Sequence, residues 1–292
     1  MLQEYLQIAI DSTVGYARYL WGDITQPGPH SYFYLLVIAS LAVYGLELAF
    51  PWRKDQSRIR RGFWVDGFYL FFNFFGFSLV GFNAAGDLVV HAVRGSLRAL
   101  GLESLELIDV RALPWWGQLL LLFVLRDFIH YWVHRLLHAV PFLWRFHQVH
   151  HSVREMGFAA HLRFHPMETV VYHTIEYLPL AAIGFGLDDF FLVHATAVVI
   201  GHLNHANVRL PIGPLRYVFN SPQMHLWHHA RQLPSKYGNN FGLSLSLWDW
   251  LFGTVYWPQD DPDVELGFED VERYPETVGA QMIEPFRAPR RP

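Results

Sequence analysis

Charge-free apolar stretches long enough to cross a bilayer are the feature that most constrains how this chain can fold. A transmembrane helix needs about 20 mainly apolar residues, and residues 27–46 and 67–86 contain no Asp, Glu, Lys or Arg. A third stretch covers residues 114–139, and residues 169–208 hold two more around a turn at 188–189. Charged residues make up only 16% of the chain, whereas soluble domains carry about 25%, so core helices of a soluble protein are the weaker alternative. We therefore expect an all-α, multi-pass membrane helical bundle of four to five spans.

Basic residues orient the predicted spans. Lys and Arg are concentrated in the short loop 51–61, and the positive-inside rule places such a loop in the cytoplasm. Counting spans from this loop puts the C-terminal end of the third span, and both ends of the following hairpin, on the cytoplasmic side. We predict an N-terminal interfacial segment (1–26), an integral membrane domain (27–258) and a cytosolic, acidic and Pro-containing tail (259–292).

Histidine is unusually frequent and cysteine is absent. The sequence has 17 His and 0 Cys, and most of the His fall in windows 130–165 and 202–229. Both windows lie on the predicted cytoplasmic face, where they can converge. The absence of Cys excludes disulfides, thiolate zinc sites, Cys-ligated iron–sulfur clusters and a cysteine nucleophile. The net charge of -4 gives no basic footprint for phosphate backbones, so we expect no nucleic-acid partner.

Three histidine boxes have the spacing of metal ligands on helices. Residues three and four apart share one face of a helix, and the boxes read HxxxH (134–138), HxxHH (147–151) and HxxHH (225–229). Imidazole suits zinc, copper, iron and nickel. Four ligands fill a tetrahedral zinc site, so eight imidazoles predict a His-rich cap that holds two metal ions on the cytosolic side. The predicted ligands are His134, His138, His147, His150, His151, His225, His228 and His229.

Other residues near the boxes are further candidates. His205 closes the fifth predicted span at the same membrane face and is a ninth candidate ligand; His202 and His165 are weaker ones, and the roles of His130 and His161 stay open. A ligating His usually donates its second N–H to an acceptor that orients the ring. The carboxylates near the boxes are equally compatible with simple helix-end charges. The candidates for orienting the imidazoles from behind are Asp127, Glu168, Asn207 and Asp249.

Longer motifs around the boxes resemble the fatty acid hydroxylase/sterol desaturase superfamily. The likeness covers roughly residues 114–257 and is specific to the superfamily, though not to one member of it. Residues 127–138, 144–152 and 225–229 resemble its histidine boxes, 163–168 and 205–211 its intervening motifs, and 239–242 and 248–254 its closing motif.

The resemblance implies a cytosolic-side, non-haem di-iron centre that uses O2 to attack C–H bonds of lipids. It places two Fe ions on the eight imidazoles of the boxes, with Zn as a substitute in preparations, and it matches His205 to a further position of the family pattern. No catalytic residue beyond the metal centre is required. We expect an O2-dependent hydroxylase of a membrane lipid, of fatty acyl, sterol or related type.

Electrons must then come from an external donor, such as a ferredoxin, a b5-type protein or a reductase, because no GxGxxG fingerprint has the strand–turn–helix setting of a nucleotide site. A lipid desaturase on the same site is the main alternative. A His-lined metal transporter is less compatible with the sequence, because the His lie at one face and not along the spans. A zinc hydrolase would need the HExxH motif, which the sequence lacks.

Overall fold

All regular secondary structure in the described part of the chain is helical. The structure, a computed structural model, describes residues 2–28, 31–77, 110–177, 187–258 and 261–287, with single residues between 87 and 99 and between 180 and 185. Within these ranges two isolated bridges accompany the helices, one from Pro51 to Val208 and one from Ala230 to Leu266. The predicted all-α class is therefore confirmed for the residues that the structure describes.

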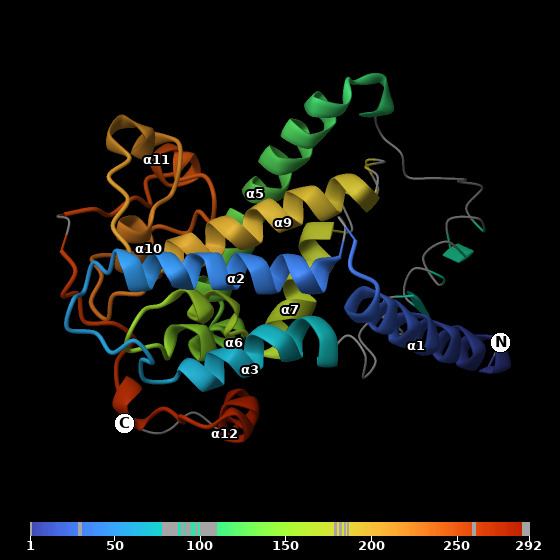
Figure 1. The fold of residues 1–292 in the computed structure, drawn as a ribbon, viewed down its shortest axis with the longest axis horizontal. Coiled ribbons are helices and arrows are strands. Elements are labelled where there is room, and N and C mark those ends of the chain that lie inside the picture. Colours follow the sequence, from blue (N-terminus) through green and yellow to red (C-terminus); the bar gives the residue numbers. More distant parts are fainter. Residues whose placement is uncertain are drawn as a thin grey trace.

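Long helices form the frame of the molecule (Figure 1). Two of them, α2 and α9, run side by side through its middle, with α3 below them and α5 crossing α9 at an angle, while α1 extends away from the body and contacts α2. A π-helix, η1, continues α3 without a break. The frame consists of α1 (Leu2–Thr25), α2 (Tyr32–Ala49), α3 (Phe63–Phe71) with its continuation η1 (Phe72–Gly76), α5 (Trp115–Ala139) and α9 (Leu187–His205).

The remaining described elements include α6 and α10, which carry most of the second and third histidine boxes. Those before α9 are η3 (Val110–Ala112), α6 (Pro141–His151), η4 (Phe158–Leu162), α7 (Pro166–Tyr172) and η5 (His173–Tyr177). Those after α9 are η6 (Gly213–Tyr217), α10 (Pro222–His228), α11 (Leu247–Leu251), η7 (Val271–Arg273), α12 (Val278–Ile283) and η8 (Glu284–Phe286).

Local sequence signals explain where the two short box helices begin. Each opens with a proline at its first turn, a position where the missing N–H costs nothing. In α10 the Ser221 hydroxyl also accepts a hydrogen bond from the Met224 N–H at 3.3 Å, which is N-cap stabilisation. Only Val140 separates α5 from α6, so the first and second boxes are forced to lie close together.

The core between α2, α3, η4 and α9 is apolar and includes Leu36, Phe158 and Val198. One buried carboxylate, that of Glu47 on α2, accepts hydrogen bonds from the backbone N–H groups of Phe158 (2.8 Å) and Asn207 (2.7 Å). Glu47 thereby fixes the start of η4 and the end of α9 against the same helix, which places the loops that follow the second box and α9 beside each other.

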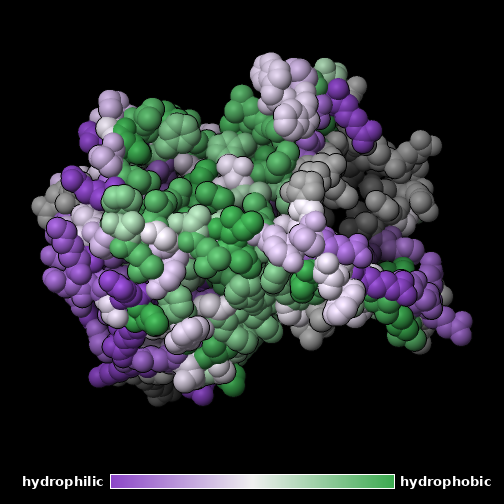
Figure 2. Space-filling view, viewed as in Figure 1, coloured by the Kyte–Doolittle hydropathy of each residue, from purple (hydrophilic) through white to green (hydrophobic). Residues whose placement is uncertain are grey.

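Apolar side chains cover the middle of the molecule on the face drawn in Figure 2. In the described residues α2 is the one helix long and apolar enough to cross a membrane, and only 22% of its most apolar window is buried inside the molecule. Figure 2 shows hydrophobic residues gathered over α2, α3 and α9, with hydrophilic residues at the end that holds the loop 51–61. Parts of the predicted spans in 67–86 and 169–187 lie outside the described residues, so the number of spans stays a prediction.

Candidate metal centre

Nine histidines converge into two buried groups. In each group one nitrogen from every ring lies within 4.8 Å of those of the other rings. The five-histidine group consists of His134, His138, His147, His151 and His228, and the four-histidine group consists of His150, His205, His225 and His229. These are the eight predicted box histidines together with His205, the ninth candidate.

The five-histidine group draws its rings from α5, α6 and α10, and acceptors behind three of the rings set their orientation. The Nδ1 atom of His134 lies 2.8 Å from the Phe241 carbonyl, and that of His228 lies 2.7 Å from the Asn239 carbonyl. The Nδ1 atom of His147 lies 2.8 Å from the Glu168 carboxylate. Carbonyl and carboxylate oxygens only accept, so each Nδ1 carries the proton. The Nε2 lone pairs of these rings are therefore turned toward the other members of the group.

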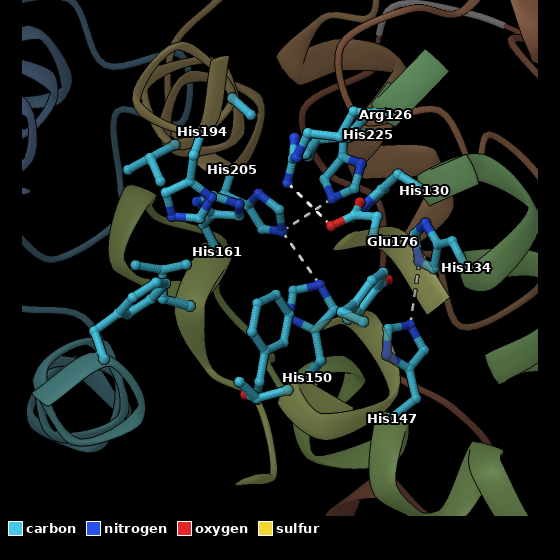
Figure 3. Close-up of a pocket in the computed structure, with 18 residues that line it drawn as sticks. Arg126, His130, His134, His147, His150, His161, Glu176, His194, His205 and His225 are labelled. Carbon is cyan, nitrogen blue, oxygen red and sulfur yellow. Dashed lines mark hydrogen bonds and ion pairs between the residues drawn. The ribbon is translucent and has the colours of Figure 1, made fainter. Parts of the chain in front are cut away.

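The four-histidine group is centred on His205, which ends α9. Its Nε2 lies 2.9 Å from that of His225 and 3.3 Å from that of His150, and the His225 and His229 Nε2 atoms are 3.2 Å apart. Figure 3 shows the rings of His150, His205 and His225 pointing toward one another. The Nδ1 of His205 donates to the Gly201 carbonyl at 2.8 Å, so its Nε2 also presents a lone pair to the group.

These nitrogen positions fit bound cations better than hydrogen bonds. The Nε2 atoms of His134 and His147 face each other at 3.2 Å, yet both carry lone pairs, so no proton lies between them. Two nitrogens that bind one ion at about 2.0–2.1 Å lie roughly 2.9–3.4 Å apart, which matches this distance and those of the four-histidine group. Several buried ring nitrogens of the two groups lack a hydrogen-bond partner, namely Nε2 of His138, His151 and His228 and Nδ1 of His150, His225 and His229.

Burial keeps five of the grouped imidazoles neutral, which is the form that binds a metal; they are those of His150, His151, His225, His228 and His229. Loss of hydration, reinforced by the neighbouring imidazoles, holds the pKa values of His150, His151 and His229 well below 6.5. The pKa of His225 is lowered in the same way. Burial lowers the pKa of His228 to about 3, although its hydrogen bond to the Asn239 carbonyl opposes the shift.

Of the four residues predicted to orient imidazoles, the structure places only Glu168 in contact with a box histidine. The Asp127 carboxylate instead accepts from the backbone N–H groups of Ser244 and Leu245 and from the Trp248 indole. A buried carboxylate needs several donors, and these groups supply them. Asp127 therefore holds the loop before α11 (residues 239–246, here called the closing loop) against α5.

Asp249 and Asn207 also act on backbone. Asp249 accepts from the N–H groups of Phe241 and Gly242, and it reaches the five-histidine group only through the Phe241 carbonyl that faces His134. Burial raises the pKa of Asp249 to about 6, against the lowering effect of these hydrogen bonds. The Asn207 side chain bonds the backbone of Arg53 at both its oxygen and its nitrogen.

The two weaker ligand candidates lie outside both groups. The nitrogens of His165 contact backbone, Nε2 at the Met282 carbonyl and Nδ1 at the Met167 N–H, each at 3.1 Å. The nitrogens of His202 contact the Ser40 hydroxyl at 3.2 Å and His161 Nδ1 at 3.0 Å. These histidines therefore tie helices together, and neither contributes to the two groups.

His161, left open by the sequence, lies against the four-histidine group, with its ring centroid 5.2 Å from that of His205. Its ring occupies space that only a glycine on α9 leaves free, because a Cβ at Gly201 would lie 2.1 Å from the ring. The close approach explains why this turn of α9 carries a glycine.

An apolar pocket borders both groups. Histidines from both line it, together with apolar side chains of α9, α7 and η1, and it continues along α9 as far as His194. From His205 to His194 the helix rises by about 16 Å. The non-histidine lining consists of Phe74, Arg126, Leu162, Phe164, Thr169, Tyr172, Glu176, Ala197, Val198 and Leu243.

Sequence reasoning missed a polar cluster in the wall of this pocket. Glu176 accepts from Arg126 at 3.3 Å and lies 2.8 Å from His130 Nδ1 (Figure 3). Glu176 lies in the π-helix η5, an irregularity that is frequent at functional sites. A carboxylate inside a predicted membrane span is itself a functional signal, and it could have identified Glu176.

The fold and the two imidazole groups define a helical protein with a buried candidate metal site made of imidazole nitrogens. Residues 119–254 match the model of the fatty acid hydroxylase family. This segment belongs to that family, which confirms the resemblance seen in the motifs.

Three relatives show how far the similarity extends. Ornithine lipid hydroxylase of Rhizobium tropici is 35% identical over 170 residues, which are 58% of this chain and 50% of that protein. Alkylglycerol monooxygenase of Homo sapiens is 33% identical over 131 residues, which are 44% of this chain and 28% of that protein. Very-long-chain aldehyde decarbonylase GL1-6 of Oryza sativa subsp. japonica is 27% identical, covering 53% of this chain and 26% of that protein. The chain thus spans half or less of the length of these relatives, and no solved structure matches it.

Proposed function

We propose that this protein is an O2-dependent oxidoreductase that hydroxylates an unactivated C–H bond of a membrane lipid. The observation that carries the proposal is the apolar pocket that opens onto both histidine groups. Such a pocket fits an aliphatic chain, and no serine or cysteine nucleophile is among its described lining residues. The family match and the lipid-oxidising relatives support the same reaction class.

The five- and four-histidine groups would each hold one iron ion. The ions would supply O2 activation when bound, and two electrons and two protons from outside would balance insertion of one oxygen atom and release of the other as water. The protein's own contribution is to position the ligand side chains. Glu168 and the carbonyls of Phe241, Asn239 and Gly201 keep Nε2 lone pairs aimed at the ions, as partners of ligating histidines generally do.

The pocket residues would select the carbon that reacts. Their apolar side chains exclude water and hold one methylene beside the histidines, which is a proximity effect. Leu162, Val198 and Leu243 line the pocket together with rings of the four-histidine group. Phe74 and His194, whose ring centroids are 5.8 Å apart, lie at the far end, where a chain that extends along α9 would terminate.

The same proposal includes the membrane arrangement. The bundle would cross the bilayer four to five times, with the histidine groups on the cytoplasmic side, next to the basic loop 51–61. A ferredoxin, b5-type protein or reductase would deliver electrons at that face. Support comes from the apolar helix α2 and from the hydrophilic end that contains this loop (Figure 2).

Desaturation is the second candidate, because both reactions begin by removing one hydrogen from the same carbon. Hydroxylation requires only that first abstraction, so we prefer it. A metal-transport function would instead require ionisable groups along a path through the spans, and the nine grouped histidines lie at one end of the long helices.

The test compares lipid extracts of cells that express the protein with extracts of cells that do not. We expect a lipid heavier by one oxygen atom that forms only in the presence of O2, and about two irons per chain in the purified protein. His150→Ala should abolish the product. His91→Ala should retain it, because His91 is a half-buried histidine that lies outside both groups and pairs with Glu4. Zinc-only protein with hydrolytic turnover, or an unchanged product in His150→Ala, would contradict the proposal.

A further inference from the structure

A second pocket, outside the metal centre, is lined by an excess of guanidinium groups. It shares no lining residue with the apolar pocket and lies where the start of α3 meets the loop after α6 and the C-terminal segment. Four arginines and a single carboxylate, that of Glu276, line it. The arginines are Arg60, Arg61, Arg154 and Arg163.

Two of these arginines form the inner wall and share one counter-ion. Arg60 and Arg163 are 5% and 4% exposed, and both pair with the fully buried Asp66. Two glycines make room for them, because a Cβ at Gly157 would meet the Arg60 guanidinium and a Cβ at Gly62 would meet that of Arg163, both at 2.4 Å. Two buried cations on one carboxylate leave a positive excess that is costly to bury unless a further anion approaches.

At the rim of the pocket, positive charges again outnumber negative ones. Arg61 and Arg154 both pair with Glu276, and these side chains are partly exposed, so the pairs are weak and exchangeable. The nearby carboxylates of Glu155 and Glu47 offset part of this charge. Both are already held by backbone donors, since Glu155 accepts from the Arg61 N–H and Glu47 from the N–H groups of Phe158 and Asn207.

Neutral polar atoms in the pocket complete a binding site. The Tyr274 hydroxyl and the Gln281 Oε1 atom are buried and have no hydrogen-bond partner, and both residues line the pocket. The Gln281 side chain is fixed, because its Nε2 donates to the Pro275 carbonyl at 2.8 Å. A phenol can donate to an anion and an amide oxygen can accept from a hydroxyl, so the unused atoms fit an anion that carries an O–H group.

We propose that this pocket binds a phosphate group, either as free inorganic phosphate or as the phosphate monoester headgroup of an anionic lipid. Forked guanidinium groups match phosphate oxygens in pairs, and a partly protonated phosphate presents the O–H that Gln281 can accept. Trp64, which is 74% exposed, lies on the same rim. A tryptophan in this position is typical of a membrane interface, where a lipid headgroup would be available.

The test uses the full chain in a phosphate-free maltoside detergent, with thermal unfolding as the readout. A ligand that binds the folded state raises the unfolding midpoint as its concentration rises. The probes are inorganic phosphate and dihexanoyl phosphatidic acid, each against sodium chloride at equal ionic strength. We expect a saturable rise with at least one probe; a response to both indicates a free-phosphate site, and a response to the lipid alone indicates a headgroup site.

Substitutions test whether the rise in the unfolding midpoint comes from binding in this pocket. Arg154→Gln should weaken the apparent affinity about tenfold or more, because it removes a hydrogen bond to a charged group. Arg231→Gln is the matched control: Arg231 is 25% exposed against 24% for Arg154 and also pairs with glutamates, but it lines a different pocket. If Arg154→Gln does not fold, Tyr274→Phe, which removes only a hydroxyl, takes its place in the affinity measurement. The proposal is overturned if neither probe exceeds the chloride effect, or if Arg231→Gln loses as much affinity as Arg154→Gln.

Discussion

The two histidine groups lie side by side but differ in how firmly their rings are held. In the five-histidine group, three rings donate from Nδ1 to fixed acceptors, the carbonyls of Phe241 and Asn239 and the carboxylate of Glu168. In the four-histidine group only His205 has such an acceptor, the Gly201 carbonyl, and the other three rings have unpartnered Nδ1 atoms.

One group therefore has the more firmly oriented rings, and the other has more of its rings exposed to the apolar pocket. Oriented ligands bind a metal more tightly, because the cost of ordering them is met during folding. The four-histidine group is less constrained, and three of its rings (His150, His205 and His225) line the apolar pocket. We infer that the five-histidine group would retain its proposed ion more firmly, while the four-histidine group would meet the proposed substrate more directly.

Removing one ligand from each group gives the largest expected effect. His151→Ala should lower the metal content of the five-histidine group and His225→Ala that of the four-histidine group, in each case by about one ion per chain, and both should abolish product formation. Metal analysis of the purified variants measures the first outcome, and lipid mass spectrometry measures the second. His91→Ala should keep both ions.

If either variant loses both ions, the two groups form one cooperative site, and the proposed difference between them is wrong. A sharper test of the difference between the two groups is to titrate the wild-type protein with a chelator. If the inference on rigidity is correct, half of the metal leaves before the other half, and His225→Ala lacks the fraction that leaves first.

Glu168→Gln tests the acceptor behind His147 and should have an intermediate effect. Glutamine keeps the shape of the side chain but is a weaker acceptor, and loss of such partners typically costs about 10–100-fold in metal affinity or activity. We expect a weaker hold on the ion of the five-histidine group and unchanged chelator release from the four-histidine group. Equal weakening of both groups would show that Glu168 supports the fold in general and not one ligand.

The nine grouped histidines were predictable from sequence, whereas their division between two groups was not. On a helix, positions i and i+4 lie about 40° apart around the axis and position i+3 lies about 60° to the other side. Accordingly His147 and His151 of the second box join one group and His150 the other. In the third box, His225 and His229 join the four-histidine group and His228 joins the five-histidine group, so the i, i+4 pair goes to the other group than in the second box. Only the packing of α6 against α5, α9 and α10 decides which way each pair faces.

Other parts of the site leave little or no trace in the sequence. The carbonyls that orient His134 and His228 belong to backbone, so no residue type identifies them in advance. Asp127 and Asp249 were candidates for orienting imidazoles because a ligating His usually donates its second N–H to an acceptor, and simple helix-end charges were the alternative. Their actual role follows from the closing loop, whose buried N–H groups need acceptors.

His202→Gln gives the smallest expected effect and marks the edge of the four-histidine group. His202 is one turn from His205 on α9, but its nitrogens contact Ser40 and His161. Glutamine should therefore leave the metal content at its wild-type value. Stability should fall by about 1–3 kcal/mol, because two buried polar groups lose a partner, and denaturant unfolding measures that change. Loss of an ion in His202→Gln would instead make His202 a ligand, and the four-histidine group would then draw two rings from successive turns of α9, like the pairs in the boxes.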